Sequence, residues 1–380
     1  MKITVSSPID DTPRVAQIRG MFDLPEAKTS TVSWDVEMPL TSRHWNIGLI
    51  VGPSGCGKST IARHLWPGAP KPTDLNWPAQ QSILDAFPEG MPIKMIAEIL
   101  SSVGFSSPPA WLRPFHVLSN GQQFRVTLAL LIANALKYTG GLPGNQEEPA
   151  QHHTPIVFDE YTSVVDRNVA KIGSAALAKT VRAKKARFVA ITCHEDVEDW
   201  IQPDWVYRPA ERTFAWRLLR PRPTIPLAVF RCEPKAWALF APHHYLTDKQ
   251  NSGCVSFMAT WNNQPVAYSS WVPWFGAGPP ARREHRTVTL PDFQGVGIGN
   301  KLSTLIAGMW KALGLKPTST TTHPAMIAAR QRSTVWKMTR SQSLMGTNDT
   351  IKHASDRLTA GFEYIGPPML KIQAKALHGH

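Results

Sequence analysis

One nine-residue segment constrains this chain more than any other part of its sequence. The apolar run at 47–51 (IGLIV) leads directly into GPSGCGKST, which fits the pattern GxxxxGK[ST]. A strand before the glycine-rich turn and a helix after it, expected from IARHLW, bring backbone N–H groups around phosphate oxygens. Lys58 is expected to reach the β- and γ-phosphates, and Ser59 to ligate Mg²⁺. The predicted phosphate-binding residues are Gly52, Pro53, Ser54, Gly55, Cys56, Gly57, Lys58, Ser59 and Thr60.

A second apolar run, at 156–158 (IVF), ends in two carboxylates, Asp159 and Glu160. Asp159 suits the Mg²⁺ shell, and Glu160 is placed to polarise a water that attacks the γ-phosphate. An apolar strand followed by two acidic residues also occurs where any strand leaves a core. The phosphate-binding segment upstream favours the catalytic interpretation.

Between these two segments lies Leu118-Ser119-Asn120-Gly121-Gln122, followed by a helical pattern (QFRVTLALLIANAL). In type and order the three segments resemble the motifs of ABC-type ATPases, whose signature is LSGGQ; Asn120 replaces one of its two glycines, and Gly121 keeps the other. The resemblance implies that Ser119, Gly121 and Gln122 close on ATP bound by another subunit. One set of motifs per chain then implies a homodimer that encloses two ATP molecules.

Four further features of the sequence bear on this resemblance. Residues 163–166 (SVVD) resemble its D-loop, and His194, after the apolar run 188–192, matches the histidine that contacts the γ-phosphate. A lone histidine there would otherwise be a surface residue. Gln80 or Gln81 corresponds to the Q-loop glutamine or is simple loop polarity, and Trp34 either stacks on adenine or packs in a core.

Length and composition limit the class of protein. A chain of 380 residues predicts two or three domains, and no apolar run approaches the length of a membrane span. The four cysteines are far apart in sequence, which favours a reducing, cytoplasmic setting over a disulfide framework. We therefore expect an ABC-type ATPase domain over 1–222 that is not a complete transporter. Proline-rich residues 220–226 are expected to form a linker, and residues 140–153 a surface loop.

The second half, 226–380, changes to short strand patterns separated by turns, as at 262–265 (NNQP). A strand pattern at 285–290 precedes PDFQGVGIG and a helical pattern at 300–314. This strand, glycine-rich turn and helix form a second anion cradle. It resembles the acetyl-CoA motif [QR]xxGx[GA] of GNAT acetyltransferases, which implies an α+β fold and binding of acetyl-CoA or another acyl-CoA. The implied binding residues are Gln294, Gly295, Val296, Gly297, Ile298 and Gly299.

Three residues are candidates for the catalysis of acyl transfer. Glu284, beside the strand before the cradle, is a candidate base, or a solvated residue of RREHR. Tyr364, in the strand-like FEYIG, is a candidate acid for the departing thiolate, or is buried for packing. His323 is a third candidate, in a turn that Pro324 is expected to hold at the surface.

Charge is unevenly distributed along the chain. Residues 226–380 hold 17 Lys and Arg against 7 Asp and Glu, a net charge of 17 − 7 = +10 out of +13 for the whole chain. The stretch 330–340 (RQRSTVWKMTR) interleaves cations with Trp336, which would suit phosphate contacts and base stacking; the alternative is a basic helix face in water. Arg282, Arg283 and Arg286 add to the positive charge.

Together these features predict an ATPase joined to an acyltransferase that acts on an amine of nucleic acid, including modification of a DNA base. Two alternatives stay open. One is an ATP-driven nucleic-acid clamp with a non-catalytic second domain. The other is an acetyltransferase for a small-molecule or protein amine, in which the positive charge attracts CoA or keeps the protein soluble.

Overall fold

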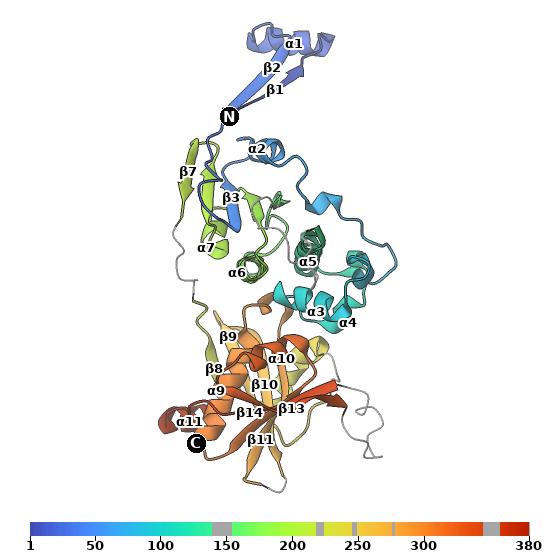
Figure 1. Cartoon of the computed structure of the whole chain (residues 1–380). Helices are drawn as coiled ribbons and strands as arrows, with labels where there is room; N and C mark the ends of the chain where they lie inside the picture. The colour runs from blue at the N-terminus through green and yellow to red at the C-terminus, as the bar shows by residue number, and fades with distance from the viewer. Residues whose placement is uncertain (139–153, 218–223, 245–248, 276–277, 345–357, 380) are drawn as a thin grey trace. The chain divides into compact units, whose positions relative to one another are not determined.

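The computed structural model describes residues 1–138, 154–217, 224–244, 249–275, 278–344 and 358–379 (Figure 1). The predicted surface loop at 140–153 lies outside these residues, as does most of the predicted linker. The chain divides into two compact units. The first comprises Met1–Asp74, Gln146–Ser163 and Val181–Pro221; the second comprises Leu75–Asn145, Val164–Thr180 and Arg222–His380.

The first unit contains a five-stranded sheet in the order β4-β5-β3-β6-β7. Four strands are parallel, and β7 pairs antiparallel with β6 at the edge. Their bounds are β3 (Ile47–Val51), β4 (Ile156–Phe158), β5 (Phe188–Thr192), β6 (Trp205–Arg208) and β7 (Thr213–Trp216). The apolar runs that predicted β3 and β4 are buried throughout, as strands of a parallel sheet require.

Helices α2 (Lys58–Leu65) and α7 (Val197–Ile201) belong to the same unit. A separate hairpin pairs β1 (Lys2–Pro8) with β2 (Thr29–Asp35), and α1 (Pro13–Phe22) lies in the connection between the two strands (Figure 1).

Part of the second unit is helical. Helix α3 (Ile93–Ser102) packs against a later helix, α10 (Pro324–Gln331), and α5 (Asn120–Tyr138) packs against α3 (Figure 1). The helical elements of this part are the 3₁₀ turns η2 (Ile83–Ala86) and η3 (Phe115–Val117), with α3 (Ile93–Ser102), α4 (Pro108–Trp111), α5 (Asn120–Tyr138) and α6 (Arg167–Ala183), the last up to Thr180. The 3₁₀ turn η1 (Pro72–Asp74) ends the preceding segment of the first unit.

The rest of the second unit is built on a seven-stranded sheet in the order β13-β14-β12-β11-β10-β9-β8. All neighbours are antiparallel except β11 and β12, which are parallel and pair only at 281–283 with 316–318. The strands are β8 (Ala228–Cys232), β9 (Val255–Trp261), β10 (Gln264–Trp274), β11 (Ala281–Thr289), β12 (Lys316–Thr321), β13 (Trp336–Leu344) and β14 (Leu358–Tyr364).

Helix α9 (Ile298–Ala312) packs on this sheet and supplies Ile306, Met309 and Trp310 to its core. The turn predicted at 262–265 is confirmed for Asn262 and Asn263, whose φ of 49° and 62° suit a two-residue hairpin of type I′, whereas Gln264 and Pro265 already belong to β10. The shorter helical elements are η4 (Pro234–Ala236), α8 (Trp237–Phe240), η5 (Ala241–His243), η6 (Pro291–Phe293), α10 (Pro324–Gln331) and α11 (Lys371–His378).

The predicted fold class is confirmed: the phosphate-binding segment belongs to a unit with a mainly parallel α/β sheet, and the second half of the chain forms a mainly antiparallel α+β region. The second unit begins its last segment at Arg222, close to the predicted boundary. It also takes in the helical segments of the first half, including the signature helix α5. No helix among the described residues is long and apolar enough to cross a membrane.

Candidate functional sites

The phosphate-binding segment forms the turn between β3 and α2. Gly55 and Gly57 adopt φ of 80° and 92°, which favours glycine, and Gly57 caps α2 without a side-chain hydrogen bond to the first turn. The Lys58 ammonium donates to the carbonyls of Gly52 and Pro53, each at 2.8 Å. These features fit a polyphosphate, because the N-terminal N–H groups of α2 are available to an anion and a cation lies beside them.

Trp34 lies against this turn. Its indole N–H donates to the carbonyl of Cys56 at 3.0 Å, and a Cβ built on Gly57 would come within 2.4 Å of the ring. The half-buried ring also packs on the core cluster of the first unit. Adenine stacking and core packing both remain predictions for Trp34, as does the Q-loop role for Gln80 or Gln81.

Strand order brings the other predicted ATPase residues to the same edge of the sheet. Strands β4, β5 and β3 are adjacent and parallel, so the segments that follow them share the carboxyl edge. Glu160 follows β4 with φ of 53°, and its carboxylate accepts from the Ser163 hydroxyl at 2.8 Å. His194 follows β5, and its backbone N–H donates to the Thr192 hydroxyl at 3.1 Å.

Of the predicted Mg²⁺ ligands, Asp159 directly follows β4 and Ser59 lies in the first turn of α2. Asp159 accepts from the backbone N–H of Glu160 at 3.0 Å. The described residues hold no group of three or more His, Cys, Asp or Glu side chains that would bind a metal by themselves. A hydroxyl and one carboxylate fit Mg²⁺, which takes few protein ligands and completes its shell with water and phosphate.

The signature begins helix α5 with a reciprocal cap. The backbone N–H of Gln122 donates to the Ser119 hydroxyl at 3.4 Å, and the backbone N–H of Ser119 donates to the Gln122 side chain at 3.2 Å. This Ser-x-x-Gln arrangement is a capping box, which holds the first turn of α5 in shape. A Cβ on Gly121 would lie 3.2 Å from Val169 and 3.5 Å from the Asp292 carboxylate.

The second anion cradle lies between β11 and α9. Gly297 has φ of 89° and caps the 15-residue helix α9 without a side-chain hydrogen bond, and a Cβ at this position would meet nothing within 4 Å. Gly295 has φ of 91°, but its Cβ would meet Gly104 at 2.6 Å. The cradle is therefore open on the Gly297 side and packed on the Gly295 side.

Gln294 does not point into open space. Its side-chain oxygen accepts from the backbone N–H of Ser106 at 2.7 Å, and its amide nitrogen donates to the carbonyl of Thr289 at 2.9 Å. The side chain is buried and links the cradle to the α3–α4 turn. Its role in acyl-CoA binding remains a prediction. The two hydrogen bonds of its side chain hold the loop between β11 and α9 in place.

Glu284, the candidate base, belongs to a buried network where β11 and β12 separate. Arg330 donates to its carboxylate at 2.7 Å, and the hydroxyls of Ser319 and Thr287 donate as well. Burial acts to raise the pKa of Glu284, but Arg330 and these donors outweigh it and hold the pKa below its usual value. A carboxylate engaged in this way is a weak base, so the network favours a structural role.

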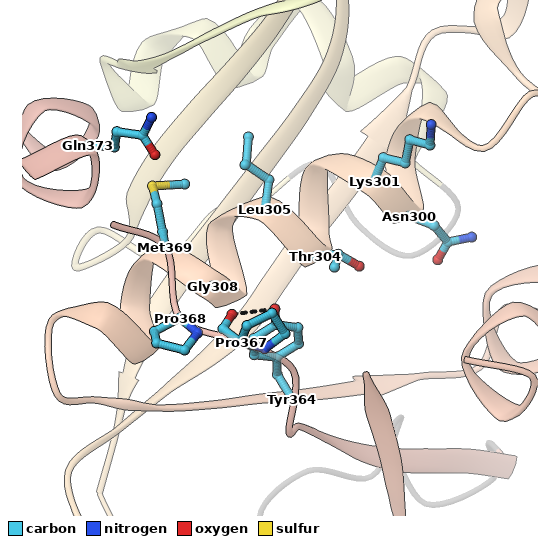
Figure 2. A pocket seen from close by; sticks show the side chains of 10 residues that line it. All are labelled: Asn300, Lys301, Thr304, Leu305, Gly308, Tyr364, Pro367, Pro368, Met369 and Gln373. Carbon is cyan, nitrogen blue, oxygen red and sulfur yellow. Dashed lines mark hydrogen bonds between the residues drawn. The ribbon is translucent and has the colours of Figure 1, made fainter. Parts of the chain in front are cut away.

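Tyr364, the candidate acid, lines a cavity of about 520 Å³ between α9 and residues 367–373 (Figure 2). Its hydroxyl donates to the carbonyl of Pro367 at 2.8 Å, and burial raises its pKa. The cavity extends from the first turn of α9, at Asn300 and Lys301, to Gly308. Tyr364 thus stays protonated in a cavity whose far end adjoins the cradle, and its role as an acid remains a prediction.

The structure corrects two sequence interpretations. Trp336 is 5% exposed and donates its indole N–H to Thr304 at 3.0 Å, and Arg330 is 2% exposed, so neither forms the expected nucleic-acid surface. His323 caps α10 and is half-buried, not held in an exposed turn. Its ring lies 3.4 Å from the carbonyl of Ser106, and burial lowers its pKa.

None of the sequence motifs includes Arg125 or Trp274 among its functional residues. Arg125 lies between Phe124 and Val126 in the helical pattern after the signature. An arginine among apolar residues of a helix is a sequence pattern that would have indicated a buried cation. Trp274 is 46% exposed at the end of β10, with the Arg283 guanidinium 3.7 Å from its ring centre, and Phe275 beside it is 89% exposed. Its signal was the pair of adjacent aromatics at 274–275.

Solved structures similar to this chain are of two kinds, each covering part of it. An ATP-binding cassette, a dimer in a post-hydrolysis state bound to ADP and Pi, is 14% identical, with 55% of this chain and 94% of that chain covered and a TM-score of 0.35. An ABC transporter component from Clostridium perfringens is 16% identical over 47% and 76%, with a TM-score of 0.32. A GNAT family acetyltransferase from Elizabethkingia anophelis, solved with acetyl-CoA bound, is 15% identical over 36% and 95%, with a TM-score of 0.27.

No protein-family model and no curated protein matches the sequence. The structural neighbours are thus ABC ATPase cassettes for one part of the chain and GNAT acetyltransferases for another.

Proposed function

We propose that this chain is an ABC-type ATPase fused to an acyltransferase that moves an acyl group from acetyl-CoA, or another acyl-CoA, to an amine. The observation that supports the ATPase is the order of parallel strands β4-β5-β3, which gathers the phosphate-binding turn, the two carboxylates and His194 at one sheet edge. The observation that supports the acyltransferase is the turn at Gly297 before α9, where no side chain caps the helix and a Cβ would meet nothing within 4 Å.

In the proposed ATPase each residue has a distinct task. Lys58 exchanges its two carbonyl contacts for β- and γ-phosphate oxygens, and Ser59 and Asp159 hold Mg²⁺. Mg²⁺ offsets the charge of the transferring phosphoryl group when it is bound. Glu160 orients the attacking water, and His194 contacts the γ-phosphate. Ser119, Gly121 and Gln122 act on the nucleotide of a second copy, so the protein works as a homodimer.

In the proposed acyltransferase the N–H groups of residues 295–299 bind the pyrophosphate of acyl-CoA. Transfer forms a bond between the acceptor nitrogen and the acyl carbon, breaks the carbon–sulfur bond, and needs one proton for the leaving sulfur. Tyr364, whose raised pKa keeps its hydroxyl protonated, gives such a proton to the departing sulfur and regains one from solvent. The proton lost by the acceptor nitrogen passes to solvent. Glu284 stays ionised in its buried network and takes no part as a base.

We further infer that the acceptor amine lies on nucleic acid. Support comes from the net charge of 17 − 7 = +10 over residues 226–380 and from the exposed aromatics Trp274 and Phe275 beside Arg283. Cations neutralise phosphates, while exposed aromatic rings stack on bases of any sequence. This group replaces the buried Trp336 as the proposed contact surface.

The first test measures acetyl-CoA binding by titration calorimetry in the wild type and in Gly297→Asp. The substitution places a carboxylate where the pyrophosphate is proposed to bind. Gly314→Asp is the matched control, because Gly314 has φ of 81°, open space around it, and a position after the other end of the same helix. Binding that is lost in Gly297→Asp and kept in Gly314→Asp supports the site. No binding to the wild type would contradict the acyltransferase.

The second test incubates the protein with radiolabelled acetyl-CoA, ATP and DNA, RNA or small amines. Label transferred to nucleic acid, and reduced by Trp274→Ala, supports the proposed acceptor. ATP hydrolysis that nucleic acid stimulates without any transfer would instead indicate a clamp with a non-catalytic domain. Transfer to small amines or to protein, with nucleic-acid binding absent or insensitive to salt, would indicate the third function.

A further inference from the structure

The signature helix and the acyl-CoA cradle belong to the same compact unit, although Arg125 of the helix and Pro291 before the cradle are 166 residues apart in sequence. Helices α3 to α5 and most of α6 belong to the second unit together with strands β8 to β14. Ile172 of α6 is fully buried in the core cluster that also contains Phe293, and Lys171 lies 5.0 Å above the ring of Trp261. The helical part is therefore docked on the acyltransferase part through a shared apolar core.

The polar contacts of this docking surface converge on the loop that precedes α9. Arg125 of α5 donates to the carbonyl of Pro291 at 2.7 Å and to the carbonyl of Asp292 at 2.8 Å. Its side chain is 0% exposed, and burial lowers its pKa to about 10 against the opposing effect of the Asp292 carboxylate 3.8 Å away. A buried guanidinium that holds two consecutive carbonyls fixes the position of η6, the turn that leads into the cradle.

The backbone of the α3–α4 turn touches the cradle directly. Gly104 has φ of 89°, and a Cβ built on it would lie 2.6 Å from the carbonyl oxygen of Gln294; a Cβ on Gly295 would lie 2.6 Å from the Cα of Gly104. Two glycines with positive φ thus meet where no side chain fits between them. The Gln294 side chain adds its hydrogen bond from Ser106.

The other end of this arrangement is the proposed ATP contact. Arg125 lies one helical turn after Gln122, and Gly121 lies beside Asp292, whose carbonyl Arg125 holds. A ligand that fixes the first turn of α5 therefore also fixes η6. Ordering by one ligand lowers the entropy that a second ligand must lose on binding, which produces positive cooperativity.

We propose that Arg125 and Gly104 fasten the acyl-CoA loop to the signature helix, so that engagement of ATP by the signature tightens binding of acyl-CoA. Arg125 is a positioning residue in this scheme and touches neither ligand. The inference rests on the proposed function, because it needs ATP at the signature and acyl-CoA in the cradle. Linkage then requires that acyl-CoA tighten ATP binding by the same factor.

The test uses the full chain carrying Glu160→Gln, which is expected to retain ATP, and measures the acetyl-CoA dissociation constant with and without ATP and Mg²⁺. We expect ATP to lower this constant by about fivefold or more, within the usual range of coupling between sites. Arg125→Lys keeps the charge but not the paired donors, and Gly104→Ala presses on Gln294; each is expected to reduce the factor to less than about twofold. Arg113→Lys, on the exposed surface of the same helical part, is expected to keep it.

A second readout does not depend on acyl-CoA. In the Glu160→Gln chain, addition of ATP is expected to slow the hydrogen exchange of amides in 290–299. In the chain that carries both Glu160→Gln and Arg125→Lys, addition of ATP is expected to leave this exchange unchanged. Thermal melting and exchange in β9 and β10, which belong to the same unit as Arg125 and Gly104, verify that the variants fold. Acetyl-CoA binding that ATP leaves unchanged or weakens would overturn the coupling and leave the proposed function standing. Absence of acetyl-CoA binding from every form would overturn the proposed function, whereas unaltered exchange in 290–299 would overturn the coupling independently.

Discussion

The buried pair of Glu284 and Arg330 leads to the sharpest prediction about stability. Arg330 is 2% exposed and contacts the hydroxyls of Ser303 and Ser319 as well as the carboxylate. Replacing it by methionine fills similar volume but leaves a buried carboxylate with no counter-ion. Breaking a buried pair in this way costs about 3–5 kcal/mol. At about 1.4 kcal/mol per tenfold change, amide protection in β11 and β12 should fall by about two to four powers of ten.

Two comparisons make this prediction specific. Glu284→Gln combined with Arg330→Met removes both charges, and we expect it to recover much of the protection that Arg330→Met loses. Lys316→Met breaks a pair with Glu363 at 2.8 Å in the same sheet, but with side chains 39% and 28% exposed. A pair this open to water is worth about 1 kcal/mol or less.

The assay is hydrogen exchange followed by mass spectrometry on peptides from β11 and β12, at neutral pH. The sign of the pH dependence follows from the lowered pKa of Glu284: its contribution is present above the unfolded pKa and is lost as pH falls through the folded pKa. If Arg330→Met cost no more than Lys316→Met, the reasoning about this network would be wrong. Glu284 would then return as a candidate base.

Four further predictions concern single residues. Glu160→Gln should retain ATP and accumulate as a dimer on size exclusion, with hydrolysis reduced at least about a hundredfold; hydrolysis at the wild-type rate would contradict its role. Lys58→Ala should lose nucleotide affinity in a fluorescent-nucleotide titration, and an unchanged affinity would remove Lys58 from the site. Tyr364→Phe should lower the turnover of acetyl transfer by about a hundredfold or more while acetyl-CoA affinity is kept; an equal loss of both would point to packing. Burial and the neighbouring Arg286 and Arg283 lower the pKa of His285 to about 4 in the folded chain. As pH falls from about 6.5 to about 4, His285 is therefore protonated in the unfolded chain but not in the folded one, which lowers stability. His285→Gln should therefore flatten the loss of stability between these pH values in thermal melts, and an identical pH profile would count against it.

The sequence alone determined the parts of this protein that depend on contiguous residues. The turn around Lys58, the strand ending at Asp159, the capping box of Ser119 and Gln122, and the glycine turn at Gly297 each need particular residues at fixed spacing. Because neighbouring residues set the backbone geometry at these positions, the sequence alone predicts it. The same holds for the Asn262-Asn263 hairpin, whose φ values few other residues adopt.

Only the tertiary structure decided which of these local parts share surroundings. Trp336 and Arg330 form a basic, aromatic pattern in the sequence, yet the fold buries both. The position of Glu284 just before the predicted strand that leads to the cradle suggested a base, but in the fold Glu284 forms a buried ion pair with Arg330. Arg125 meets Pro291, 166 residues later in the chain, through a contact that no local pattern encodes. Burial and long-range contact set the pKa and partners of a side chain, and both arise only when distant segments pack together.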